Sequence, residues 1–218
     1  MSYQIAIDGP AGAGKSTIAK KVAKTKGFIY VDTGAMYRAM AYYLLNEKVD
    51  PENAKEIEDK CQEADITIQY VGGEQVVLLN GANVNGVLRT EEVGNMASTT
   101  SKNPKVRERL TQLQKELAAK NDVVMDGRDI GTCVLPNADV KIYLTASSAV
   151  RAKRRFDELT AKGESCDIKK IEEDIVKRDQ QDMSREIAPL KQAEDAHLVD
   201  SSYMTIEEVV QKILSLCK

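Results

Sequence analysis

The feature that most constrains the fold lies near the N-terminus, where an apolar stretch runs into a glycine-rich loop. Residues 3–7 are mostly apolar, Gly9 to Ser16 read G-x-x-x-x-G-K-S, and residues 17–26 have a helical pattern. In this strand–loop–helix context the glycines let backbone N–H groups turn inward, above the positive end of a helix. Lys15 can then reach the β- and γ-phosphates of a nucleotide, and the Ser16 hydroxyl can hold Mg²⁺. The motif therefore predicts a phosphate loop that binds a nucleoside triphosphate.

Composition limits the remaining choices. The chain has 218 residues and is 42% hydrophobic, which suits one α/β core with insertions. A net charge of −3 and a pI of about 5.5 argue against non-specific nucleic-acid binding. Four scattered cysteines and a single histidine argue against a zinc site and favour reduced thiols in the cytoplasm. We expect neither a signal peptide nor a membrane span, because no apolar run approaches ~20 residues.

Strand-like apolar runs alternate with helical patterns along the chain. This alternation is typical of βαβ units and predicts an α/β fold with a parallel sheet. Capping signals mark the helices: Gly27 ends the first, Asp50-Pro51 and Asn103-Pro104 open others, and Thr205 begins a capping box with Glu208. The predicted strands cover residues 3–8, 28–32, 122–126, 139–145 and 196–200.

Residues 65–88 break this rhythm. Apolar and polar residues alternate over 66–70, Gly72-Gly73 supplies a turn, and an apolar run over 76–79 ends at Asn80-Gly81. This pattern predicts a small antiparallel insertion. Large insertions in α/β folds tend to cover the ligand crevice, and decoration without a role is the alternative.

Residues 150–186 are highly charged and contain few large apolar side chains. Their spacing places three arginines on one helix face and a second charged set on another, with a helix break at Gly163. Because arginines on one face repel unless an anion lies among them, we expect a mobile lid over a polyphosphate. A solvated helix pair is the alternative. The first set is Arg151, Arg154 and Arg155, and the second is Arg178, Asp182 and Arg185.

Two predicted strands end in charged residues. Asp32 to Arg38 read D-T-G-A-M-Y-R after the second strand, and Asp126 to Asp129 read D-G-R-D after the third. Open α/β sheets bind ligands at the carboxyl ends of their strands. We expect Arg38 to face the group that accepts a phosphate and Asp126 to face the metal. A capped helix with an incidental arginine and a plain β-turn are the alternatives.

Four segments in combination closely resemble the bacterial cytidylate kinases: the phosphate loop and residues 32–38, 126–131 and 178–185. The resemblance extends from Ile5 to the C-terminal helix. It implies a P-loop NTPase fold, a three-layer αβα sandwich with a five-stranded parallel sheet, a small antiparallel insertion and a helical lid. The implied parts are a core (1–32, 101–149 and 187–218), a monophosphate-binding domain (33–100) and the lid (150–186).

The resemblance also implies transfer of the γ-phosphate of ATP to CMP or dCMP with Mg²⁺, in pyrimidine nucleotide metabolism. ATP and its metal ion would be held by Gly9, Pro10, Ala11, Gly12, Ala13, Gly14, Lys15, Ser16, Thr17, Arg154 and Arg155, with Ser16 on the metal. The acceptor phosphate would be held by Arg38, Arg128 and Arg185, which form the catalytic set together with Lys15. Cytosine would be read by Ser98, Arg107 and Asp129, the sugar by Arg178 and Asp182, in a pocket lined by Asp32, Thr33 and Tyr37.

This chemistry needs no general base. The acceptor is a phosphate with a second pKa of ~6, so it is already a nucleophile at neutral pH. The single histidine, His197, lies near a predicted strand and is assigned a structural role. Catalysis would rest on holding two polyanions in line and neutralising their charge. We expect a cytoplasmic monomer that binds these small molecules and neither nucleic acid nor a membrane.

Two other functions fit parts of the sequence. A kinase for UMP, AMP or a hydroxyl acid would use the same loop and arginines. Only the resemblance selects cytosine, through Ser98, Arg107 and Asp129, because a carboxylate can accept from an exocyclic amine that uracil lacks. A GTP-hydrolysing switch would need an N-K-x-D-like guanine reader and a glutamine that orients water. The sequence supports neither feature.

Overall fold

The computed structural model describes residues 2–217 and contains two compact units. Unit 1 combines Met1–Phe28 with Asp122–Lys218, and unit 2 is Ile29–Asn121. The expected monophosphate-binding domain, residues 33–100, lies inside unit 2, and the expected lid, residues 150–186, lies inside unit 1. The division of the chain into core, monophosphate-binding domain and lid stays a prediction.

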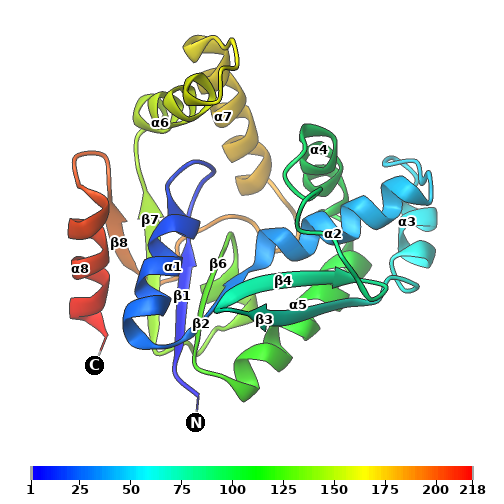
Figure 1. The fold of residues 1–218 in the computed structure, drawn as a ribbon, viewed down its shortest axis with the longest axis horizontal. Coiled ribbons are helices and arrows are strands. Elements are labelled where there is room, and N and C mark those ends of the chain that lie inside the picture. Colours follow the sequence, from blue (N-terminus) through cyan, green and yellow to red (C-terminus); the bar gives the residue numbers. More distant parts are fainter. Residues whose placement is uncertain (1, 218) are drawn as a thin grey trace. The chain divides into compact units, whose positions relative to one another are not determined.

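Five strands form a parallel sheet in the order β2-β6-β1-β7-β8. Each strand begins one residue later than the sequence predicts. Because parallel strands end at the same edge, Asp8 at the end of β1 pairs in register with Gly127 of β6. The α/β fold class, with helices around a parallel sheet and a separate antiparallel sheet, is confirmed (Figure 1). The strands are β1 (Gln4–Asp8), β2 (Ile29–Asp32), β6 (Val123–Gly127), β7 (Val140–Thr145) and β8 (His197–Asp200).

The phosphate loop joins β1 to α1 (Lys15–Lys26) in unit 1. This helix begins two residues before its predicted start, because Gly14 takes a left-handed conformation (φ 88°) and lets the helix start at once. The predicted end at Gly27 is confirmed. The C-terminal helix α8 (Ile206–Leu216) carries the predicted capping box, with reciprocal hydrogen bonds between Thr205 and Glu208. α1 and α8 pack against each other.

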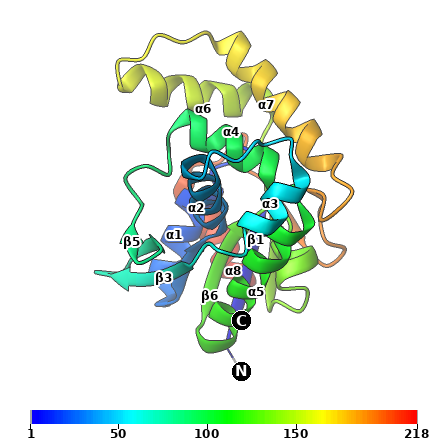
Figure 2. The same cartoon turned by 90° about the vertical axis from the view of Figure 1, so that its right-hand side faces the viewer.

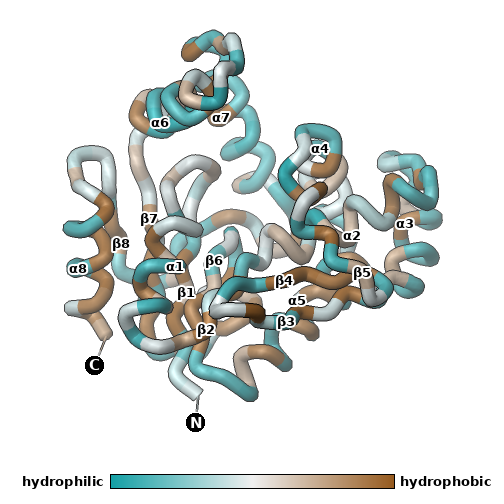
Figure 3. Tube along the Cα trace, in the orientation of Figure 1, coloured by the Kyte–Doolittle hydropathy of each residue, from teal (hydrophilic) through white to brown (hydrophobic). Residues whose placement is uncertain are grey.

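The expected lid segment consists mainly of two helices, α6 (Ser148–Ala161) and α7 (Ile168–Met183), with Gly163 in their connection as predicted. They pack against each other (Figure 2) and are mostly hydrophilic (Figure 3). A short, wide helical turn that the sequence analysis did not predict, η1 (Ile130–Val134), follows β6. Wide turns of this kind often lie at functional sites.

Unit 2 contains the predicted antiparallel insertion. β3 (Ile66–Val71) pairs with β4 (Glu74–Leu79) across the Gly72-Gly73 turn, and the short β5 (Ala82–Asn83) extends this sheet. The helices of the unit are α2 (Thr33–Asn46), α3 (Ala54–Lys60), α4 (Glu91–Thr100) and α5 (Pro104–Lys120). Asn103 caps α5, as its sequence predicts.

One helix start is corrected. Asp50-Pro51 does not open a helix, because the Asp50 side chain accepts a hydrogen bond from the Glu52 N–H and closes a turn. The helix starts later, and its cap is Asn53, which accepts from the Glu56 N–H. Within residues 2–217, no helix has the length and apolar character needed to cross a bilayer.

Candidate active site

The phosphate loop lies at the carboxyl end of β1, and its path depends on close packing. A Cβ atom at Gly9 would come within 1.9 Å of the Leu144 carbonyl oxygen of β7. No side chain fits there without moving the sheet, so the loop passes directly over the neighbouring strand. The predicted motif therefore has the strand–loop–helix setting that its function requires.

Lys15 is buried at the start of α1, and its ammonium donates to the Pro10 carbonyl oxygen of the same loop at 2.8 Å. Burial, together with repulsion from the Arg128 guanidinium, lowers the pKa of Lys15 to about 7 against the attraction of nearby carboxylates. A bound polyanion would therefore strongly stabilise the charged form of Lys15.

Ser16 and Asp126 form the part of the site that suits a metal ion. The Ser16 hydroxyl donates to the Asp126 carboxylate, at the end of β6, at 3.0 Å. In the described part of the chain no three acidic, histidine or cysteine side chains cluster to hold a metal. Mg²⁺ does not need such a cage, because it binds one or two protein oxygens together with substrate phosphates and water. The pair therefore fits Mg²⁺ bound with a nucleotide.

Asp8, which the sequence analysis did not select, fixes the segment after β6. Its carboxylate accepts from the N–H groups of Ile130 at 2.8 Å and Gly131 at 2.7 Å. Burial raises the pKa of Asp8 to about 6, although these two hydrogen bonds oppose the shift. Asp8 thus caps the wide turn that directly follows the predicted site residues Arg128 and Asp129. The sequence signal that could have identified Asp8 is an acidic residue at the end of an apolar strand.

Three predicted acceptor-side residues meet in unit 1. The Arg128 Nε donates to Asp182 at 2.8 Å, and Arg185 donates to the other oxygen of the same carboxylate. Burial alone would raise the pKa of Asp182, but the Arg128 and Arg185 guanidiniums outweigh it and hold the pKa low. The charge of the exposed Arg178 adds to this effect. The result is an ionised carboxylate that holds two arginines together.

The arginines of α6 have partners within the protein, whereas the sequence led us to expect an anion among them. Arg154 donates to the Ser201 carbonyl oxygen at 2.8 Å, beyond the end of β8. Arg155 is half exposed and pairs with Glu158 of its own helix at 2.9 Å. Arg151, which was not assigned to the site, pairs with Asp179 of α7. The protein itself therefore relieves the repulsion between these arginines.

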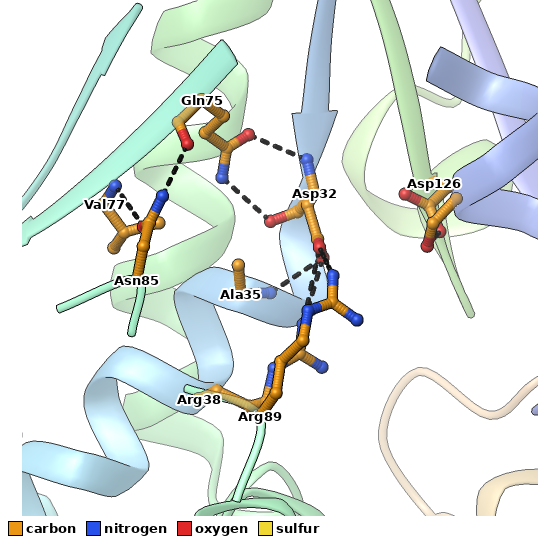
Figure 4. Close-up of polar contacts among 9 residues, drawn as sticks. Asp32, Ala35, Arg38, Gln75, Val77, Asn85, Arg89 and Asp126 are labelled. Carbon is orange, nitrogen blue, oxygen red and sulfur yellow. Dashed lines mark hydrogen bonds and ion pairs between the residues drawn. The ribbon is translucent and has the colours of Figure 1, made fainter. Parts of the chain in front are cut away.

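Asp32 is the centre of a polar cluster in unit 2 (Figure 4). Its carboxylate caps α2 by accepting from the Ala35 N–H at 2.8 Å, and it pairs with Arg38 at 3.4 Å and Arg89 at 3.5 Å. Gln75 of β4 holds the Asp32 backbone with two hydrogen bonds. The insertion therefore positions a predicted site residue. Sequence reasoning missed Arg89 and Gln75, whose roles depend on contacts distant along the chain.

Arg38 retains donor capacity in this cluster. Its Nε atom is buried and has no hydrogen-bond partner within the protein. A buried donor without a partner is costly, so an anion that accepts from it would be favoured. This observation agrees with the expected role of Arg38 at an acceptor phosphate.

The expected base-reading residues are partly brought together in unit 2. Arg107 is buried, donates to the Ser101 carbonyl oxygen at 3.3 Å, and lies 5.6 Å from the centre of the Tyr37 ring. Ser98 is one turn before Ser101, whose hydroxyl donates to the Ser98 carbonyl oxygen. Thr33 is buried at the start of α2. Asp129, also buried, belongs to unit 1.

Two solved structures share the fold at low sequence identity. An uncharacterized protein from Eubacterium ventriosum ATCC 27560 matches with a TM-score of 0.54 at 12% identity, covering 98% of this chain and 97% of that one. The shikimate kinase from Bacteroides thetaiotaomicron matches with a TM-score of 0.50 at 14% identity, with the same coverage of 98% and 97%. These likenesses confirm the fold alone.

Sequence relatives are much closer. The chain is 53% identical to the cytidylate kinase of Caldicellulosiruptor bescii over 212 residues, which cover 97% of this chain and 94% of that protein. It is 49% identical to the cytidylate kinase of Bacillus cereus strain B4264 over the same shares of the two chains. The family model for cytidylate kinase matches residues 5–218. The chain therefore belongs to the cytidylate kinase family.

Proposed function

We propose that the protein transfers the γ-phosphoryl group of ATP to CMP or dCMP and forms ADP with CDP or dCDP. Family membership supports this reaction, and the observation that carries it structurally is the contact between the phosphate loop and β6. There Ser16 meets Asp126 at 3.0 Å, beside the buried ammonium of Lys15. This arrangement matches what P-loop enzymes need to hold a triphosphate and its metal ion.

On the donor side, Lys15 and the backbone N–H groups from Gly12 to Thr17 would bind the phosphates of ATP, in a loop that begins at Gly9. Ser16 and Asp126 would hold Mg²⁺, which neutralises phosphate charge when it is bound. Lys15 would exchange its bond to the Pro10 carbonyl for the β- and γ-phosphates. Arg154 and Arg155 of the lid remain proposed contacts to ATP.

On the acceptor side, the proposed phosphate ligands are Arg38, Arg128 and Arg185. Asp182 supports this role because it holds Arg128 and Arg185 together with their charges paired. At neutral pH the CMP phosphate, with a second pKa of ~6, is largely dianionic and needs no proton removed before it attacks. The chain would then orient the two phosphates in line and stabilise the charge of the transition state.

Selection of the base would fall to the pocket lined by Asp32, Thr33 and Tyr37. Arg107 and Ser98 would contact the cytosine ring edge, and the Asp129 carboxylate would accept from its exocyclic amine. Uracil carries a carbonyl oxygen at that position, which a carboxylate would repel. Arg178 and Asp182 would contact the sugar.

The segment 150–186 would close over both nucleotides and exclude water, which limits wasteful hydrolysis of ATP. We infer a monomer that works in the cytoplasm on these small molecules. The reduced thiols expected from the cysteine spacing suit that compartment.

The test is the initial rate of ATP consumption with CMP, dCMP, UMP or AMP, and of ADP formation with no acceptor. The proposal expects CMP and dCMP to give the highest kcat/KM and the sample without acceptor to give little ADP. A preference for UMP or AMP would contradict the assigned base selection. Rapid ADP formation without an acceptor would favour a nucleotide-hydrolysing switch instead.

A further inference from the structure

An ion pair from the two helices α6 and α7 binds both backbone polar groups of one phosphate-loop residue, Ala11. Asp179 of α7 accepts from the Ala11 N–H at 3.3 Å, and Arg151 of α6 donates to the Ala11 carbonyl oxygen at 2.8 Å. The two side chains are joined to each other at 2.6 Å. Both polar groups of Ala11 are thus satisfied by one neutral pair from outside the loop.

The Arg151–Asp179 pair is buried and is held by further contacts. The side chains of Arg151 and Asp179 are only 7% and 11% exposed. Arg151 also donates from Nε to the Ala146 carbonyl oxygen at 2.8 Å, at the end of β7, so its guanidinium is anchored at three points. A Cβ atom at Gly12 would lie 3.3 Å from the Arg151 Cβ, which shows how closely α6 approaches the loop.

We propose that Asp179 and Arg151 are positioning residues for ATP, because they fix the two peptide groups that flank Ala11 and thereby the path of the phosphate loop. This inference rests on the proposed binding of ATP at the loop. It assigns a role to two residues outside the expected site, and it joins the expected lid to the donor site through a direct contact.

The physical basis is the composition of the loop. Gly9 to Gly14 carry no side chain longer than that of proline, so the loop has few packing contacts of its own to define its shape. A carbonyl oxygen turned toward the phosphate-binding N–H groups of the loop would repel a polyphosphate. The Arg151 guanidinium instead binds the Ala11 carbonyl oxygen from outside the loop. The pairing with Asp179 keeps this cation from leaving an unbalanced charge beside the loop.

Two variants of one residue separate positioning from charge. Asp179→Asn and Asp179→Ala both remove the negative charge, but only Asn keeps an oxygen that can accept from the Ala11 N–H. We expect KM for ATP to be about fivefold higher in Asp179→Ala than in Asp179→Asn, because one hydrogen bond is lost. KM for CMP should be the same in both variants.

Asp174 supplies the matched control, because it is an exposed aspartate on the same helix. Asp174→Asn and Asp174→Ala should not differ in either KM. Equal KM values for ATP in Asp179→Asn and Asp179→Ala would overturn the proposal. So would a parallel rise of both KM values with a fall in kcat, which would indicate a general structural defect.

A second arm tests the cation. Arg151→Met leaves the Asp179 carboxylate unpaired beside a polyanion site and should raise KM for ATP by about tenfold or more. Adding Asp179→Asn to Arg151→Met should recover part of this loss. If KM for ATP does not fall in the double variant, the pair does not act on the donor site.

The exchange of the Ala11 amide gives a second readout, which does not depend on enzyme activity. In the ligand-free wild type and in Asp179→Asn this amide should exchange slowly with solvent. Fast exchange in both would overturn the proposal. If the wild type transfers phosphate from ATP to no monophosphate, the proposed function itself is contradicted. This outcome differs from every outcome that would overturn the positioning role of Asp179 and Arg151.

Discussion

Lys15 is the buried cation of the phosphate loop. Its ammonium is buried against a neutral carbonyl group, and burial holds its pKa at about 7. A bound triphosphate would raise this pKa toward the ordinary value near 10.5. Binding of ATP is therefore linked to the protonation of one residue.

We predict that ATP binding at pH 8 takes up close to one proton. At that pH the ligand-free Lys15 is mostly neutral, whereas ATP is already ionised, so the complex gains the proton. The uptake should fall gradually as the pH is lowered through 7, because a growing share of Lys15 is already charged before ATP arrives. Calorimetric titrations in buffers of different ionisation enthalpy measure this number. The Lys15→Arg variant, always charged, should bind ATP without proton uptake, and equal uptake in both proteins would refute the assignment.

Arg38 is expected to act on the acceptor alone. Its replacement by alanine should lower kcat/KM for CMP by an amount equivalent to about 2–5 kcal/mol, because a charged partner of the phosphate is lost. ATP affinity, measured without CMP, should barely change. Arg38→Lys, which keeps the charge but not the forked geometry, should recover part of the loss. A comparable loss of ATP affinity would place Arg38 at the donor instead.

Asp129 is expected to choose between bases. Asp129→Ala should reduce the CMP preference over UMP by roughly ten- to hundred-fold, since a buried polar contact worth ~1–3 kcal/mol disappears. The measurement is the ratio of kcat/KM for CMP and UMP in the variant and the wild type. An unchanged ratio would move base recognition to other residues.

At the scale of elements, the sequence predicts those features whose structure depends on residues close together in the chain. The strands follow from apolar runs between turn residues, and the phosphate loop follows from its glycines and the Lys15-Ser16 pair. The wide turn over Ile130–Val134 was missed because its cap, Asp8, lies in another strand. Helix α3 was misplaced because Asp50 and Asn53 both favour a cap, and only the turn geometry decides between them.

The same limit applies to the site. Residues on continuous motifs could be proposed from the sequence, and two of these motifs meet where Asp182 joins Arg128 and Arg185, while the roles of these residues stay a prediction. Arg151 and Asp179 could not be selected, since Asp179 contacts a loop residue 168 positions away. Gln75 likewise reaches Asp32 only through the folded insertion.

The capping box of α8 gives a stability prediction at this scale. Thr205→Ala removes the hydroxyl that accepts from the Glu208 N–H, so the free energy of unfolding should fall by about 1 kcal/mol. Denaturant titration measures it. Thr205→Ser keeps the hydroxyl and should behave as wild type, and an alanine variant of undiminished stability would show that the cap contributes nothing.

At the scale of the whole molecule, segment 150–186 is expected to respond to both nucleotides together. It has few large apolar side chains, so the parts of its helices away from the Arg151–Asp179 contact with the phosphate loop should open often without ligand. A bisubstrate analogue should slow amide exchange across the segment and reduce thiol labelling at Cys166, whereas ATP alone should have little effect. Exchange that is as slow as in the sheet without any ligand would show a rigid part of the core.

The central claim is transfer from ATP to a cytidine monophosphate, and isotopic label tests it most directly. The enzyme is mixed with ATP labelled in its γ-phosphate and with equal concentrations of CMP, UMP and AMP, and the labelled products are separated. The account predicts that most of the label appears in CDP and very little in inorganic phosphate. Label found mainly in inorganic phosphate, UDP or ADP would contradict it.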